Sequence, residues 1–325
     1  MKKKISLIIP SYNDKNKLTK LLSNLKTWQA IPNEIIIIDS SQKKFLITKD
    51  FKRFIKKFNI RFLLIHKKNL FPGHARNIGI VNSTNSLLAF LDTSTLPNSK
   101  WLYNGLKVLS ANSSEEGVWG NTYYLANTFF AKILRASTVG TKPIKTFPGS
   151  IMKKNIFNKC GLFIESVRAG EDGDLRSRLE IHQIKMYNSR EFLTYDKFNF
   201  LTISLLLKKW FRNYISTSKL PFSRTQKDFY FYVSSFILII LAYNWNNVVA
   251  SWDTNSSFYI PNITKISIFL IFISYIFTRG ILVPKKKGVS LNFLFPVNFI
   301  FISFLSMMLD MTKILAFALN KLNLK

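Results

Sequence analysis

The chain has 325 residues, 47% of them hydrophobic, and a formal net charge of +30. Such an excess of basic residues can indicate a nucleic-acid partner. Here they are dispersed and no nucleic-acid-binding motif accompanies them, so we expect no such partner. The single cysteine, Cys160, excludes an internal disulfide and has no partner at metal-binding spacing.

The composition changes along the chain. Up to about residue 204 the apolar runs are short and charged residues are frequent, whereas three long apolar runs follow residue 229. We therefore expect a soluble domain over residues 1–204, a connecting segment over residues 205–228 and a membrane region over residues 229–325.

Short apolar runs alternate with helical patterns in the first third of the chain. The predicted strands are Ile5–Ile9, Glu34–Ile38, Ile60–Ile65 and Leu87–Leu91. The predicted helices are Leu18–Leu25, Phe51–Phe58 and a short one carrying Ala75–Asn77. Each strand is almost entirely apolar, which is typical of strands covered on both faces. The alternation predicts an α/β fold with a mostly parallel sheet.

The order of elements is less regular after Trp101. A helix is expected over Lys100–Leu109 and a strand over Val118–Leu125. Phe147–Ser150 reads as a turn. A further helix is expected to begin near Glu171, because acids in the first turn suit the helix dipole.

The connecting segment is basic and amphipathic. Its cations are Lys208, Lys209, Arg212, Lys219, Arg224 and Lys227, and large apolar residues are interleaved with them. Such a segment is expected to lie at the membrane surface, with its cations toward anionic lipid. A solvated helix packed on the first domain is the alternative.

Three membrane spans are predicted over Phe229–Trp245, Ile266–Val283 and Leu291–Leu309, each approaching the roughly 20 residues that a bilayer requires. The loop Asn246–Thr264 contains no Lys or Arg, whereas Lys285–Lys287 follows the second span. The positive-inside rule therefore predicts a cytoplasmic first domain, in agreement with the lack of a signal peptide at the first residues.

The tail after the third span allows several arrangements. If that span crosses fully, Asp310, Lys313, Lys321 and Lys325 lie outside, against the positive-inside preference. A re-entrant turn near Pro296 and an interfacial tail helix are the alternatives.

Four short pieces follow predicted strands or open a helix beside them. They are Pro10–Tyr12, Asp39–Ser41, Gly73–Asn77 and Asp92–Thr95. Since the carboxyl ends of parallel strands meet at one edge of a sheet, we expect these pieces to line one cleft. Its backbone amides, hydroxyls, arginine and acids suit a nucleotide diphosphate. Asp39 can bind a base or ribose, and Arg76 can offset phosphate charge.

The chain also carries an ordered set of motifs over roughly residues 4–195. They are IIPSYND, the strand ending in Asp39, GHARNIGI, LAFLDTSTLP with Trp101, and GEDGDLRSRL. This set resembles the family-2 glycosyltransferases, which have the GT-A fold. The later spans resemble the anchors of bacterial members that build surface polysaccharide or lipid-linked glycans. The resemblance implies a multi-pass protein of the inner (plasma) membrane.

The resemblance also implies roles for individual residues on the donor side. Pro10, Ser11, Tyr12 and Asp39 match the positions that hold the nucleobase and ribose of the donor. Arg76 matches the arginine beside the donor phosphates.

Two further acids have implied roles. Asp92 matches the first acid of the Asp-X-Asp motif, which works with Mg²⁺ or Mn²⁺ to bind the diphosphate. Asp172 matches the general base of inverting members, which accepts the proton of the attacking hydroxyl. Glu171 and Asp174 are secondary candidates that read equally well as first-turn acids. His74 is a minor candidate near the phosphates.

Ser94 is the one departure from the motif set, because it replaces the second acid of Asp-X-Asp. A hydroxyl is a poorer ligand than a carboxylate for a hard cation. Three outcomes are open: Asp92 and the diphosphate suffice to hold the metal, Arg76 and nearby lysines replace the metal, or catalysis has been lost.

These observations predict a membrane-anchored, inverting glycosyltransferase. It would move a sugar from a nucleotide-sugar donor to a membrane-associated glycan or lipid-linked acceptor. The Gln-X-X-Arg-Trp run of processive synthases is missing, with only a loose echo at Lys208–Arg212, so single addition is expected. The alternatives are a degenerate protein that binds nucleotide-sugar or glycan lipid, and a structural subunit of a polysaccharide assembly.

Overall fold

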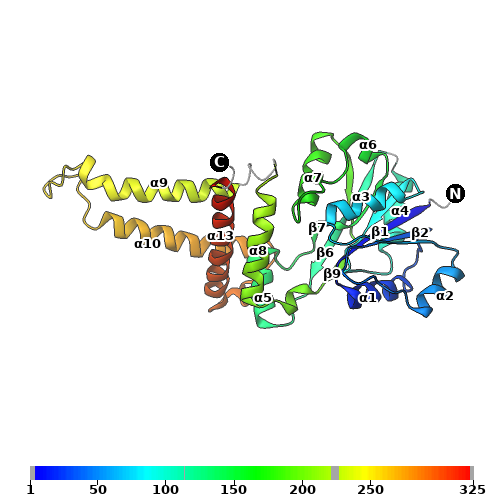
Figure 1. Cartoon of the computed structure of the whole chain (residues 1–325). Helices are drawn as coiled ribbons and strands as arrows, with labels where there is room; N and C mark the ends of the chain where they lie inside the picture. Colours follow the sequence, from blue (N-terminus) through cyan, green and yellow to red (C-terminus); the bar gives the residue numbers. More distant parts are fainter. Residues whose placement is uncertain (1–3, 113, 221–226, 323–325) are drawn as a thin grey trace.

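The computed structural model describes residues 4–112, 114–220 and 227–322. A curved sheet with helices around it forms one part of the molecule, and a pair of long helices projects from the opposite end (Figure 1). Between these two parts lie α8 (Ile203–Thr217) and α13 (Asn298–Leu322), next to one another.

The first half of the sheet is parallel. Its strands β1 (Ile5–Ser11), β2 (Glu34–Asp39), β3 (Arg61–His66) and β4 (Leu87–Phe90) lie in the order β3-β2-β1-β4. The helices α1 (Lys15–Leu25), α2 (Lys49–Lys57) and α3 (Pro72–Asn82) connect them. Successive residues of β1 enter different cores, with Leu7 and Ile9 on one side of the sheet and Ile8 on the other. The predicted strands and helices of this part are confirmed.

The second half of the sheet is partly antiparallel. From β4 it continues through β7 (Ile144–Lys153), β6 (Gly117–Tyr124), β9 (Leu193–Tyr195) and β5 (Thr95–Pro97), and β8 (Met186–Asn188) pairs with β6. Of the strand pairings among the described residues, β4–β7, β6–β7 and β5–β9 are antiparallel and the others are parallel. The predicted α/β fold is therefore confirmed, with a mixed sheet.

Helices support this second half. They are α4 (Trp101–Ala111), α5 (Phe129–Thr138), α6 (Ile156–Cys160), α7 (Glu171–Ile181) and the 3₁₀ turn η1 (Lys197–Phe200). The indole of Trp101 donates to the carbonyl of Gly149 at 2.8 Å. The prediction of a turn over Phe147–Ser150 is wrong, because strand β7 includes these residues. Gly149 adopts a left-handed backbone conformation (φ 89°) within the strand.

The projecting pair consists of α9 (Lys227–Val248) and α10 (Ile263–Ile276), and the latter continues through the π-helical turn η3 (Phe277–Leu282) and α11 (Val283–Lys286). Among the described residues, two helices are long and apolar enough to cross a membrane, Ile263–Lys286 and Asn298–Asn320, while α9 has a shorter apolar stretch, Phe236–Val248. The predicted Arg224 and Lys325 lie outside the described residues.

The third predicted span has the wrong bounds. The short helix α12 (Leu291–Leu294) ends before the Phe295–Pro296 bond, and the long helix begins only at Asn298. Figure 1 shows α13 crossing the base of the α9–α10 pair instead of running along it. Asp310, predicted to follow the span, lies inside α13, where it accepts hydrogen bonds from Arg279 at 2.8 Å and from Tyr275 at 2.9 Å.

Candidate functional site

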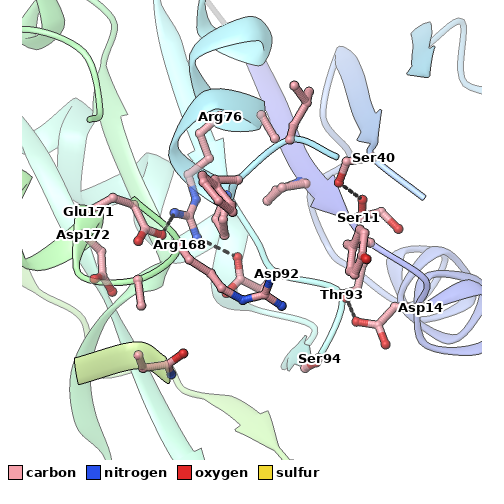
Figure 2. A pocket seen from close by; sticks show the side chains of 18 of the residues that line it. Ser11, Asp14, Ser40, Arg76, Asp92, Thr93, Ser94, Arg168, Glu171 and Asp172 are labelled. Carbon is pink, nitrogen blue, oxygen red and sulfur yellow. Dashed lines mark hydrogen bonds and ion pairs between the residues drawn. The ribbon is translucent and has the colours of Figure 1, made fainter. Parts of the chain in front are cut away.

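A cavity of about 480 Å³ opens at the carboxyl ends of β1 and β4, opposite the start of α7 (Figure 2). It forms between β1 and β4, where the strand order reverses, since β2 and β3 follow on one side of β1 and β4 lies on the other. Such a change of direction leaves a crevice beyond the strand ends. The residues of the sequence prediction that line it are Pro10, Ser11, Tyr12, Arg76, Asp92, Ser94, Glu171 and Asp172.

Arg76 lies in the wall of this cavity with only 4% of its surface exposed. Its Nη1 donates to Glu171 Oε1 at 2.6 Å, and its Nη2 donates to Asp92 Oδ1 at 3.0 Å. Burial alone would lower the pKa of Arg76, but Asp92 and Glu171 outweigh it and raise the pKa, so the guanidinium stays charged. Arg76, predicted to lie beside the donor phosphates, is thus buried in the cavity wall, where it bridges two acids.

The secondary candidates Glu171 and Asp174 are both buried in ion pairs. Burial raises the pKa of Glu171, while the charge of Arg76 opposes that rise. Asp174 Oδ2 lies 2.8 Å from Arg178 Nη2. Both acids are therefore held in ion pairs in the first turn of α7.

Asp172 differs from its neighbours on α7. Its Oδ1 accepts a hydrogen bond from the amide of Gly173 at 2.8 Å, and no cation pairs with it directly within the described part of the chain. Asp172 lines both this cavity and a second cavity of about 480 Å³. Of the three first-turn acids, Asp172 is the one that is not buried and that lines both cavities.

Asp39 and His74 lie outside the main cavity. Asp39 is fully buried, and its two carboxylate oxygens accept the amides of Ser41 at 3.2 Å and Phe45 at 2.6 Å. It lines an adjoining cavity of about 540 Å³ that meets the main one at Ser11. His74 faces Glu165, with 3.5 Å between the two side chains.

Three cations at the cavity come from elements that the sequence did not connect with it. They are Arg168, in the loop before α7, and Lys209 and Arg212 on α8. Figure 2 shows Arg168 extending across the cavity past Asp92. Burial and the charge of Arg168 lower the pKa of Arg212. In the sequence, the run Lys208–Arg212 is a signal for two of these cations, although its basic, amphipathic pattern predicts a place at the membrane surface.

The α8 cations reach the cavity because α8 is tied to the loop before α7. The hydroxyl oxygen of Ser216 accepts the amides of Arg168 at 2.8 Å and Ala169 at 3.2 Å. Gly170 adopts a left-handed conformation (φ 96°) at the start of α7, next to Thr217 and Leu220. Helix α8 is thus part of the cavity wall.

Residues 6–161 match the family model for glycosyl transferase family 2. These residues form a glycosyl transferase family 2 domain. Over 181 residues the chain is 30% identical to an uncharacterized glycosyltransferase of Rickettsia bellii (strain RML369-C), and over 164 residues it is 29% identical to the glycosyltransferase AglE of Haloferax volcanii. The two alignments cover 52% and 49% of this chain, but only 25% and 52% of the respective relatives.

The fold is also similar to that of a solved glycosyltransferase. The mannosyltransferase PcManGT from Pyrobaculum calidifontis, in complex with GDP-Man and Mn²⁺, aligns with a TM-score of 0.54 at 12% identity. The alignment covers 98% of this chain and 88% of that protein. The GT-A-like fold of the glycosyl transferase family 2 domain is thereby confirmed.

The acids of this domain fit a cation that is shared with a substrate. No group of three His, Cys, Asp or Glu residues that could hold a metal occurs in the part of the chain described by the structure. Asp92 is 39% exposed, with Oδ1 bonded to Arg76. Ser94 lies away from that carboxylate (Figure 2), and Thr93 donates to Asp14 at 3.0 Å. One carboxylate plus substrate phosphates is a common Mg²⁺ arrangement.

Proposed function

We propose that this chain is a membrane-anchored, inverting glycosyltransferase. It moves a sugar from a nucleotide-sugar donor to a membrane-associated glycan or lipid-linked acceptor, one sugar at a time. The observation that supports the proposal is that Asp172 lines two cavities, which we assign to the two substrates. The glycosyl transferase family 2 domain supports the reaction class.

The donor occupies the main cavity and its extension. The nucleoside lies toward Ser11 and the cavity beside Asp39, and the diphosphate lies at the cations Arg168, Lys209 and Arg212. The GDP-Man bound to PcManGT supports a nucleotide-sugar donor of this kind.

Asp172 is the general base. It accepts the proton of the acceptor hydroxyl as that oxygen bonds to C1 of the sugar, and the bond from C1 to the diphosphate breaks on the opposite face. The hydroxyl enters from the second cavity, so attack is in line and the configuration at C1 inverts. The Arg168 and Arg212 guanidinium groups stabilise the charge of the departing diphosphate.

A divalent cation, Mg²⁺ or Mn²⁺, would be held by Asp92 together with the donor phosphates. When bound, it supplies Lewis-acid stabilisation of the leaving diphosphate. The Mn²⁺ bound to PcManGT supports this assignment. Arg76, which donates to Asp92 Oδ1 at 3.0 Å, would hold that carboxylate in place.

The α9–α10 pair is the membrane anchor in this proposal. The loop between these helices contains no Lys or Arg, whereas Lys285–Lys287 lies at the end nearest the domain. This asymmetry favours a cytoplasmic domain. Helix α13 crosses the base of this pair and lies beside α8 (Figure 1). We therefore assign α8 and α13 to the membrane surface, within reach of acceptor lipids.

The experiment is transfer by the full chain in lipid vesicles, with a panel of UDP- and GDP-sugars. Asp172→Asn is expected to lower turnover at least about 100-fold without changing the affinity for the nucleoside diphosphate. The control is Asp50→Asn, an exposed acid on α2 outside both cavities. Unchanged turnover of Asp172→Asn would remove the assigned base, and donor binding by a wild-type chain without turnover would favour a binding protein.

A further inference from the structure

The second cavity contains the chemistry of a specific acceptor. It shares Asp92, Asp172 and Asn213 with the donor cavity, and its volume is about 480 Å³. Two cations also line it: Lys145 on β7 and Arg176 on α7. The catalytic scheme proposed above uses neither of them.

These two cations lie against the same buried indole. Lys145 Nζ is 5.6 Å from the centroid of the Trp119 ring, and Arg176 Cζ is 5.7 Å from it. Desolvation lowers the pKa of Lys145, and the charge of Arg176 lowers it further. The fold therefore places two exposed like charges around one indole in the wall of the cavity, where a bound anion would interact favourably with both.

Lys145 and Arg176 have few ion pairs with carboxylates among the described residues. Arg176 donates from Nε to Glu180 Oε1 at 3.3 Å, in a pair exposed to solvent, and in the part of the chain that the structure describes its two terminal nitrogens make no hydrogen bond. Within the described residues no ion pair joins Lys145 to an acid, and Glu180 acts on it only through its more distant charge. A forked guanidinium and an ammonium at one edge of a cavity are the donors that phosphate oxygens prefer.

The spacing along α7 relates this edge to the reacting atoms. Asp172 and Arg176 are four residues apart, so they share one face of the helix with their Cβ atoms roughly 5–6 Å apart. A ligand that contacts both must carry its anionic group about one helical turn from its reacting hydroxyl. A sugar phosphate satisfies this when its phosphate and its hydroxyl lie on opposite sides of the ring.

We propose that the acceptor is a sugar phosphate, free or lipid-linked, whose phosphate binds Lys145 and Arg176 while its hydroxyl faces Asp172. This assignment rests on the proposed function, because it uses Asp172 as the base. It goes further in naming the acceptor by its charge and by the position of that charge.

The test compares matched acceptors with the full chain in lipid vesicles. One arm uses a soluble sugar 1-phosphate against the methyl glycoside of the same sugar. The other uses a sugar linked to polyprenol through diphosphate against the neutral polyprenyl glycoside. The phosphate form is expected to be at least about tenfold better in kcat/KM. Preference in either arm supports the proposal, and the better phosphate substrate identifies the source.

Variants assign the effect to the two cations. Lys145→Gln and Arg176→Gln are each expected to raise KM for the phosphate acceptor about tenfold, with unchanged donor KM and unchanged hydrolysis of donor by water. Lys107→Gln, an exposed lysine on α4 outside both cavities, is the control. Arg176→Lys is expected to recover part of the loss, because it restores the charge without the fork.

The outcomes separate this proposal from the one it rests on. Equal use of the neutral acceptors, or an unchanged acceptor KM in both glutamine variants, would overturn it while donor hydrolysis kept the enzyme assignment. A wild-type chain that neither hydrolyses donor nor transfers sugar would overturn the proposed function. In that case thermal stabilisation by the sugar 1-phosphate, present in wild type and lost in the two variants, still decides the phosphate site.

Discussion

Arg76 Nη1 lies 2.6 Å from Glu171 Oε1, and this buried pair joins α3 to α7 across 95 residues of sequence. The other end of the same guanidinium bonds to Asp92. Gly73 allows this approach, since a Cβ at that position would collide with the backbone of Ile164, in the loop that leads to α7. The pair thus positions the helix that carries Asp172 relative to the strand end that carries Asp92.

Removing one member of this pair is expected to destabilise the fold. Arg76→Met leaves the Glu171 carboxyl buried without its partner, which costs about 3–5 kcal/mol of unfolding free energy. The double variant Arg76→Met with Glu171→Leu is expected to recover much of that loss, because no buried charge is left. Denaturant unfolding of the three proteins measures this. Equal stability of the single and double variants would show that the pair carries no such coupling.

Arg212 is expected to contribute to donor affinity. Arg212→Gln removes a cation from the cavity wall and should raise the donor KM about tenfold, with a smaller effect on the acceptor KM. Lys208→Gln provides a matched control on the same helix, since Lys208 is exposed and does not line the cavity. If the two variants behave alike, the α8 cations act on the membrane and not on the donor.

Metal dependence is expected to act through Asp92 alone. Mn²⁺ should raise the affinity of the wild-type chain for a nucleoside diphosphate, and EDTA should reverse this. Asp92→Asn should abolish the effect of Mn²⁺, whereas Ser94→Ala should keep it, because Ser94 lies away from the Asp92 carboxylate. Calorimetric titration with and without Mn²⁺ measures it. If Ser94→Ala abolished the effect of Mn²⁺ on affinity, the Ser94 hydroxyl would be a metal ligand and the prediction would be wrong.

Tyr124, in the wall of the second cavity, is expected to limit stability at high pH. Burial, with the charges of Asp172 and Asp92, raises its pKa from 10.0 to about 12. The folded state therefore keeps the phenol proton more tightly than the unfolded state does. The resulting stability is fully present below pH 10.0 and is lost as pH rises toward about 12.

The loss over this range is roughly 2 kcal/mol. Tyr124→Phe should therefore show a flatter decline in unfolding free energy above pH 10, measured by denaturant titration at a series of pH values. Tyr103→Phe, an exposed tyrosine on α4, should decline like the wild type. An identical slope for Tyr124→Phe and wild type would contradict the prediction.

Much of the fold was predictable because its signals are local. The isoleucines of β1 and β2 alternate between the two cores, which is why both strands are apolar along most of their length. The predicted bounds of these strands differ by one or two residues from those observed. The same holds for the helix that begins at Glu171. The convergence of Pro10–Tyr12, Arg76 and Asp92 on one cavity followed from parallel strands that end at the same edge.

The sequence by itself thus determined the order of elements, the glycosyl transferase family 2 motifs and the apolar helices, since each depends on neighbouring residues. Only the tertiary structure decided the rest. The pairing of Arg76 with Glu171, the turning of Arg212 into the cavity and the course of α13 across the helical pair depend on packing between distant segments. The sequence gives the charge of each side chain, but its partner depends on which distant segments the fold brings together.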